Sequence, residues 1–525
     1  MTTGRRAGCG LVLTVAVLFT IGNLASADPP FVVKPTGPAG SHPWLLCHVD
    51  GVLFYRAYDG IHGEELWRSD GTEDGTYMVK DIRDDPPGPF AQGCRPHNLT
   101  AVGEMLFFVA RDGVHGNELW VSDGAEPNTV MVRDIWPGQS SSLPTQLVNM
   151  NGTLFFAASS EGSGDKLWKS DGTAAGTVMV MDADWWSVFP TAMIVINDTL
   201  FFVGSDTRSP YTGTELWKSD GTRDGTVLVK DINPFLGSFP RHLTRVGDIL
   251  FFFADDGTHG LALWKSDGSE AGTMMVKDID TEHHYSGYFP DHCCTAVVDS
   301  NLFFVFDDGT HGWELWRSDG TESGTAIVRD IDPNRWEAPA GLTAVGKTLF
   351  FSADDRIHGR ELWLSDGTEE GTRMIKDICQ FLFECSSRPT ELTAVNDVLY
   401  FFASGVEPAT AGLWRSDGTE DGTVRVSDEA LDVTWLTNAD GTLFFRGSEA
   451  KYGNELWCYR PDFGDIDGDR DVDIADFAAF SRSWQQDGCN LTNSWCNGGD
   501  ISDFGVVDFS DLNKLADNWL MGTLP

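Results

Sequence analysis

The stretch ELWRSDGTEDGTYMVKDI, at residues 65–82, decides the fold because it returns along the chain. Close copies are ELWKSDGTRDGTVLVKDI at 215–232, ELWRSDGTESGTAIVRDI at 314–331 and ELWLSDGTEEGTRMIKDI at 361–378, and weaker copies fill the gaps. Across all copies, the tryptophan of the Leu-Trp pair occurs nine times, about 49 residues apart. That period is typical of four-stranded propeller blades and exceeds the roughly 34 to 45 residues of helical repeats.

Each copy contains four short segments with strand character. In residues 342–378 these are LTAV, TLFFSA, ELWLSD and TRMIKDI, separated by turns that contain glycine, and helical periodicity is absent. The Leu-Phe-Phe segment at 349–351 is apolar on both faces, as expected of a strand in a sheet that packs between two other sheets. We therefore expect a mainly β protein whose sheets form a single large propeller.

The number of blades follows from the ends of the repeat array. Nine copies have the Leu-Phe-Phe-like strand and the Leu-Trp strand, but only eight continue into a fourth strand. Phe-Val-Val-Lys at 31–34 resembles Tyr-Met-Val-Lys at 77–80 and would supply the missing strand. Such pairing would close the ring and cover its sheet edges. We expect nine four-stranded blades, with eight as the alternative.

The composition excludes several classes of function. The 525-residue chain has 37 Lys and Arg against 79 Asp and Glu, which gives a formal net charge of -42. So acidic a surface repels the phosphates of nucleic acids and anionic membranes. A hydrophobic content of 41% and an aromatic content of 12% supply enough apolar material for packed cores, so the acidity does not indicate disorder.

The N-terminus has the pattern of a Sec-type signal peptide. Two arginines at positions 5 and 6 precede an apolar run at 11–21, and Ala-Ser-Ala at 25–27 offers a cleavage site. The run is too short to span a bilayer, so we expect no membrane insertion. We expect residues 1–27 to be removed by cleavage near Ala27, and the mature protein to be secreted or held at the cell surface.

The cysteines then predict local disulfides. Nine remain after cleavage, and Cys379/Cys385 and Cys489/Cys496 are the natural local pairs in an oxidising compartment. The odd number leaves one thiol over. A catalytic cysteine is disfavoured because no histidine partner accompanies any of them at a recognisable spacing.

The repeat units resemble the ELWxxDGT repeats of secreted bacterial proteins, and the resemblance covers roughly residues 45–460. It implies a propeller-like domain, which we assign to residues 28–461, and says little about its ligand. Pyrroloquinoline-quinone dehydrogenases are also propellers with tryptophan-bearing repeats. Here, however, the tryptophan precedes the Asp-Gly-Thr turn rather than following it, so that resemblance is weak.

The repeated polar residues have structural explanations. The aspartate of each Ser-Asp-Gly turn is expected to hold the turn by accepting backbone amide bonds, and a calcium-lined loop is the alternative. The His-Gly histidines are expected to make local hydrogen bonds rather than a shared metal site, because the blades would spread them around a rim. The five histidines are His62, His115, His259, His311 and His358.

A functional site is expected where the repeat is irregular. Two segments qualify: residues 179–189, with Asp182, Asp184, Trp185 and Trp186, and residues 281–294, with His283, His284, His292, Cys293 and Cys294. Neither pairs a nucleophile with a base at a recognisable spacing, so no catalytic residue and no cofactor-binding residue of the propeller is assigned.

The composition changes after residue 461 and predicts a calcium-binding module at 462–525. DIDGDRDVDIAD at 465–476 has the oxygen spacing that Ca2+ requires, and a helix with apolar residues on one face is expected to follow. A second and more degraded copy, DISDFGVVDFSD, follows at 500–511. The expected ligands are Asp465, Asp467, Asp469, Asp471, Asp473 and Asp476 in the first loop, and Asp500, Ser502, Asp508 and Asp511 in the second.

Two calcium loops, each followed by one helix, resemble a dockerin type I domain. The resemblance implies a small α-helical domain that docks to a cohesin-like module of another protein. Residues near the first recognition helix would contact that partner: Ala475, Phe477, Ala478, Ser481 and Arg482.

Together these features predict a secreted, non-catalytic binding and scaffold protein. Its propeller would present a surface for a glycan or protein ligand, and its C-terminal module would bind Ca2+ and a cohesin-type partner, in polysaccharide degradation or at a cell surface. The first alternative is a polysaccharide-active propeller enzyme, either a glycoside hydrolase or a lyase. A quinone-dependent oxidoreductase is the second.

Overall fold

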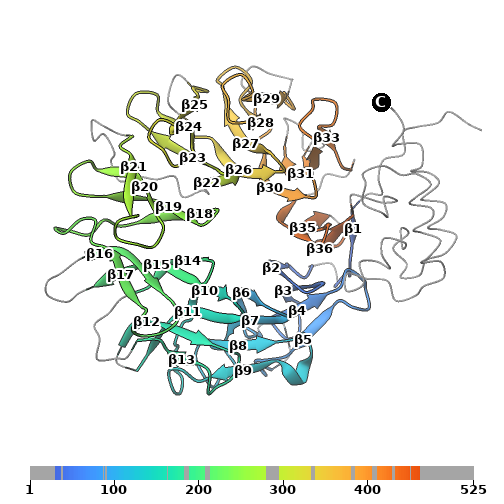
Figure 1. Cartoon of the computed structure of the whole chain (residues 1–525). Coiled ribbons are helices and arrows are strands. Elements are labelled where there is room, and N and C mark those ends of the chain that lie inside the picture. Colours follow the sequence, from blue (N-terminus) through green and yellow to red (C-terminus); the bar gives the residue numbers. More distant parts are fainter. Residues whose placement is uncertain are drawn as a thin grey trace, which may run out of the picture.

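The computed structural model describes residues 30–460, except 37–39, 87, 89–90, 162, 182–188, 207–212, 280–294, 333–336, 380–384, 405–410, 428–431 and 450. These residues form nine four-stranded sheets arranged as a ring, and the colours of Figure 1 run around it in chain order. The prediction of a mainly β propeller is confirmed, and nine blades rather than eight are present. The expected signal peptide and dockerin-like module lie outside the described residues.

The blades are numbered here in chain order, and each is an antiparallel meander. Blades one to three comprise β2 (Trp44–Val49), β3 (Val52–Tyr58), β4 (Glu64–Ser69) and β5 (Tyr77–Lys80); β6 (His97–Val102), β7 (Met105–Ala110), β8 (Glu118–Ser122) and β9 (Val130–Arg133); and β10 (Thr145–Met150), β11 (Thr153–Ser160), β12 (Ser163–Ser170) and β13 (Val178–Met179). Blades four to six comprise β14 (Thr191–Ile196), β15 (Thr199–Asp206), β16 (Gly213–Ser219) and β17 (Val227–Lys230); β18 (Arg241–Val246), β19 (Ile249–Asp255), β20 (Leu261–Ser266) and β21 (Met274–Lys277); and β22 (Thr295–Val298), β23 (Asn301–Asp307), β24 (Trp313–Ser318) and β25 (Ala326–Arg329). Blades seven and eight comprise β26 (Ala340–Val345), β27 (Thr348–Asp354), β28 (Arg360–Ser365) and β29 (Arg373–Lys376); and β30 (Thr390–Val395), β31 (Val398–Ala403), β32 (Gly412–Ser416) and β33 (Val424–Arg425). Blade nine comprises β34 (Thr434–Ala439), β35 (Thr442–Glu449), β36 (Gly453–Tyr459) and β1 (Phe31–Val32), and a short 3-10 helix, η1 (Glu126–Asn128), lies in blade two.

The hydrophobic core lies between neighbouring blades, as the two-faced apolar strands predicted. One cluster joins Phe251, Phe253 and Leu263 of blade five to Phe304 and Trp316 of blade six. Within a blade, the Leu-Trp tryptophan packs beside the second phenylalanine of the central strand, as Phe304 does with Trp316 at 6.3 Å between ring centroids. The repeat therefore encodes both the packing within a blade and the packing between blades.

The ring closes through the N-terminal strand. β1 pairs antiparallel with β36, with Phe31 opposite Cys458 and Val32 opposite Trp457, and completes the sheet of blade nine. Lys34 then donates from Nζ to the carbonyl oxygen of Thr76 in blade one at 2.7 Å. Fourth-strand lysines elsewhere make the same bond to the next blade: Lys80 to Thr129, Lys230 to Thr273 and Lys277 to Thr325. The predicted closing strand is thus confirmed.

Two further features of the described residues bear on the predictions. Cys379 and Cys385 form a disulfide, as predicted, whereas Cys489 and Cys496 lie outside the described residues. Cys47 and Cys94 are free thiols. Within the described part of the chain, no helix is long and apolar enough to cross a membrane.

Candidate functional site

The regular part of the ring is held by buried glutamates that precede the Leu-Trp pair. Glu361 accepts bonds from the backbone nitrogens of Ile378 and Ser387 and from the Ser387 hydroxyl, and so anchors the linker that leads into blade eight. Glu65, Glu118, Glu215 and Glu314 bind their own linkers in the same way. Glu455 instead binds Thr36 and Ser41, each through a backbone nitrogen and a hydroxyl. These glutamates therefore fix the linkers on one face of the ring.

Burial has a marked effect on these carboxyls. It raises the pKa of Glu65, Glu215, Glu314 and Glu361 to about 7, although the amides that they bind lower it in part. A perturbed carboxyl pKa in a cleft is a signal of catalysis. Here, however, the residues recur in blade after blade and are no more than 1% exposed, so their role is structural.

The Ser-Asp-Gly turns are formed as predicted. Asp319 accepts bonds from the backbone nitrogen and the hydroxyl of Thr321, and Ser318 shares a bond with Thr325. The two bonds from Thr321 hold the pKa of Asp319 below its usual range. Every turn of this kind uses its aspartate inside the turn, with equivalent bonds at Asp70, Asp123, Asp171, Asp220, Asp267, Asp366 and Asp417.

The His-Gly histidines also behave as predicted. His358 Nδ1 lies 2.8 Å from Asp355 Oδ2, and that aspartate also caps the loop by accepting the backbone nitrogens of Ile357 and His358. The Asp355 carboxylate raises the pKa of His358. The prediction of local hydrogen bonding is thus confirmed at His358.

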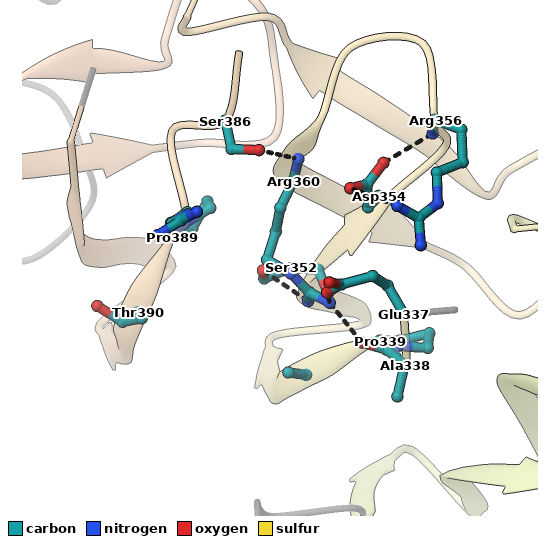
Figure 2. Close-up of a pocket in the computed structure, with 12 residues that line it drawn as sticks. Glu337, Ala338, Pro339, Ser352, Asp354, Arg356, Arg360, Ser386, Pro389 and Thr390 are labelled. Atoms are coloured by element: carbon teal, nitrogen blue, oxygen red, sulfur yellow. Dashed lines mark hydrogen bonds and ion pairs between the residues drawn. The ribbon is translucent and has the colours of Figure 1, made fainter. Parts of the chain in front are cut away.

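A cavity of about 620 Å³ lies between blades seven and eight, where the repeat departs from its own pattern. Its walls come from the linker at 337–340, from the hairpin between β27 and β28, and from the linker at 386–390. Figure 2 shows these three segments around the opening. The charged residues that line it are Glu337, Asp354, Arg356, Arg360 and Arg388, and the polar ones are Ser352, Ser386 and Thr390.

Arg360 forms one side of the cavity. Its guanidinium donates to Glu337 Oε2 at 2.6 Å, to the Ala338 carbonyl at 2.9 Å and to the Ser352 carbonyl at 3.1 Å. Its backbone nitrogen binds the Ser386 hydroxyl, a contact visible in Figure 2. The corresponding position is Glu64 in blade one and Asn454 in blade nine, so this arginine is not part of the repeat.

Arg356 lies on the other side, in the loop that carries His358. Four other blades have glycine at this position, with φ between 75° and 88°: Gly60, Gly113, Gly257 and Gly309. Arg356 adopts φ 66°, a conformation that costs an L-residue about 1 kcal/mol or more. Its Nε and Nη2 each lie 3.3 Å from Oδ2 of Asp332, a carboxylate that is 2% exposed. Strain of this kind at a cavity wall is a signal of function.

The site residues predicted from the sequence do not include those that line this cavity. The calcium ligands and the partner-contact residues of the C-terminal module lie outside the described residues, and so do the named residues of the two irregular segments. Sequence reasoning missed Arg356 and Arg360, although one signal was available. In the hairpin sequence Asp-Asp-Arg-Ile-His-Gly (354–359), Arg356 stands where the equivalent Asp-Asp-Gly-Thr-His-Gly (307–312) has Gly309.

Comparisons with known proteins assign the chain to no family. No protein-family model matches the chain, and a search of curated proteins finds no match. Among solved structures, a puromycin hydrolase is 16% identical with a TM-score of 0.36, and the match covers 73% of this chain and 63% of the hydrolase. The chain thus spans less than two thirds of that protein.

Two structures from Pyrococcus species match over a similar share of the chain. For the acylaminoacyl peptidase of Pyrococcus horikoshii the identity is 11% and the TM-score 0.33, with 69% of this chain and 57% of the peptidase covered. For the β-propeller domain of the Trilobed protease of Pyrococcus furiosus the values are 10% and 0.35, with 70% and 94% covered. At these identities the likeness concerns the fold alone.

These comparisons correct one prediction. We expected a non-catalytic binding and scaffold protein, on the ground that a regular propeller offers a surface and no visible chemistry. The solved structures that match are instead those of a hydrolase, a peptidase and the β-propeller domain of a protease. A propeller fold does not by itself indicate a scaffold, because one fold supports unrelated functions and the site has to be argued separately.

Proposed function

We propose that the cavity between blades seven and eight is the recognition site of this protein for a small, polar molecule. The observation that carries the proposal is the coincidence of the cavity with the loss of the repeat pattern. Arginines replace Gly60 and Glu64 of blade one in one hairpin of blade seven, and both replacements line the same cavity. Ligand sites are concave, and a few polar groups among apolar ones fix the ligand.

The size and lining of the cavity support a ligand of modest size. About 620 Å³ lies within the range of roughly 300 to 1,000 Å³ that is usual for small-molecule sites. Ala338, Pro339, Ala340 and Pro389 supply apolar surface between the charged groups. A short peptide or one or two sugar residues would fit these dimensions.

The proposal can be tested by filling the cavity. Thr390 is exposed, begins β30 and lines the cavity, so a Thr390→Trp variant should fold and reduce its volume. Ligand-observed NMR with a library of acetylated dipeptides and sugar acids should give hits for the wild-type chain that this variant loses. Thr145, the exposed first residue of β10, provides the control, and Thr145→Trp should keep every hit. Hits that survive Thr390→Trp, or a library without hits, would contradict the proposal.

We also propose that residues 462–525 form the dockerin-like module that their sequence indicates. Its first loop, 465–476, would bind Ca2+ and order the helix that meets a cohesin-like partner. The support is the spacing of the aspartates alone. Calorimetric titration of the full chain with CaCl2 should show a site that the double variant Asp465→Ala, Asp467→Ala lacks. An unchanged isotherm would rule the first loop out.

A further inference from the structure

Arg356 has the features of a group that binds an anion in the cavity. A guanidinium has five N–H donors in a planar fork, and it matches a carboxylate with two parallel bonds. Asp332 accepts from Nε and Nη2 of Arg356 through a single oxygen. Nη1 lies 4.0 Å from the Asp354 carboxylate, beyond hydrogen-bond distance. The edge of the guanidinium away from Asp332 therefore keeps donors for a ligand.

The charges around the cavity are also more nearly balanced than those of the chain as a whole. Arg360 is matched by Glu337 at 2.6 Å, and Arg356 by Asp332 at 3.3 Å. Arg388 lines the cavity, is exposed and has no ion pair among the described residues. Whereas acids outnumber bases by 79 to 37 over the whole chain, the lining of this cavity has three arginines against two acids, Glu337 and Asp354. Near this cavity, the arginines offset the electrostatic repulsion between an anion and the acidic surface.

We infer that Arg356 binds the carboxylate of the ligand that occupies this cavity, and that Asp332 positions it to do so. The inference rests on the proposed function, since it assigns the ligand class of the same cavity. The carboxylate belongs either to the C-terminus of a short peptide or to a uronic acid. Arg356 is thus a specificity-determining residue, and the strain at its φ of 66° is retained because glycine cannot bind the anion.

Blade five shows which residues can stand in place of Arg356 and Asp332 in a folded blade. There, glycine stands at the Arg356 position as Gly257, and the side chain of Asn233 lies 3.1 Å from where its Cβ would be. Asn233 corresponds to Asp332 in the preceding linker. The double variant Arg356→Gly, Asp332→Asn therefore rebuilds an arrangement that the chain already folds. It also avoids leaving a buried carboxylate without the guanidinium that pairs with it.

The experiment measures dissociation constants for matched pairs of probes: acetylated dipeptides with a free carboxylate against their amides, and galacturonic acid against its methyl ester. With the wild-type chain, one of the two acids should bind about tenfold or more tightly than its neutral partner. The double variant should lower that ratio to near one. Comparing the peptide pair with the uronate pair identifies the source of the carboxylate.

Lys347 supplies the control for general electrostatics. It is exposed at the other end of β27, in the turn after β26, so Lys347→Gln removes one positive charge without touching the cavity. This variant should keep the preference for acids. The inference is overturned if the hits that Thr390→Trp abolishes bind equally well as acids and neutral partners, or if the double variant keeps the preference. In both cases the cavity still binds, so the proposed function stands. If Thr390→Trp abolishes no hit, the proposed function falls and the inference falls with it.

Discussion

Blades one and seven share a framework and differ at the positions that face the cavity. Both have a buried glutamate that holds the following linker, Glu65 and Glu361, and both cap the same hairpin with an Asp-His pair. In blade one the hairpin turns through Gly60 at φ 83°, with Glu64 paired to Arg56. In blade seven Arg356 and Arg360 take these two positions. The comparison shows that the hairpin tip tolerates replacement while the glutamate and the caps hold the blade.

The largest effect is expected where the shared framework also closes the ring. Glu455 is fully buried and accepts four bonds from Thr36 and Ser41, so it joins the two ends of the described chain. Glu455→Ala should lower the free energy of unfolding by about 3 kcal/mol and expose the N-terminal strand to protease. Urea unfolding and limited proteolysis measure the two effects. Glu65→Ala is the matched control, because it removes an equivalent carboxylate without opening the ring. Equal protease sensitivity in the two variants would show that Glu455 does not close it.

The pH dependence of stability tests the framework that blades one and seven share. The pKa of Glu65 and Glu361 is raised from 4.5 to about 7 in the folded chain. Below pH 4.5 both states bind the proton and no stability is lost. Between 4.5 and 7 the unfolded chain releases a proton that the folded chain keeps, so stability falls as pH rises, and the loss is complete above 7.

The histidines of the Asp-His pairs also make the stability fall as the pH rises, at the upper end of this pH range. The raised pKa of His62 and His358 adds stability that is full below the usual histidine pKa and is lost at higher pH. Burial raises the pKa of Asp59, but hydrogen bonds from His62 outweigh it and lower the pKa overall. The stability that the ionised Asp59 contributes is lost only as the pH falls through this lowered pKa. Thermal stability should therefore be greatest at mildly acidic pH and decline towards pH 8. Glu65→Gln should flatten the decline by up to about 1.4 kcal/mol per pH unit. A stability profile that rises from pH 5 to 8 would contradict this account.

How far the sequence predicts each region follows from the same comparison. The nine blades, the closing strand at 31–34, the turn aspartates and the local histidine bonds could all be predicted, because each repeats a pattern whose physical reason is local. The cavity could not, because it depends on Glu337, Arg360 and Arg388, which lie in segments separated in the chain. Their meeting depends on linker paths that no periodicity describes.

The smallest effect is expected from moving the arginine of blade seven into blade one. Gly60 has φ 83°, and a Cβ added there would meet no heavy atom within 4 Å, so Gly60→Arg should be limited by backbone strain alone. We expect the free energy of unfolding to fall by about 1 kcal/mol, and Gly60→Asn, which tolerates this conformation better, to lose less. Urea denaturation of the two variants measures the difference. If Gly60→Arg is as stable as the wild-type chain, the conformation of Arg356 carries no strain, and its retention in blade seven no longer indicates a bound ligand.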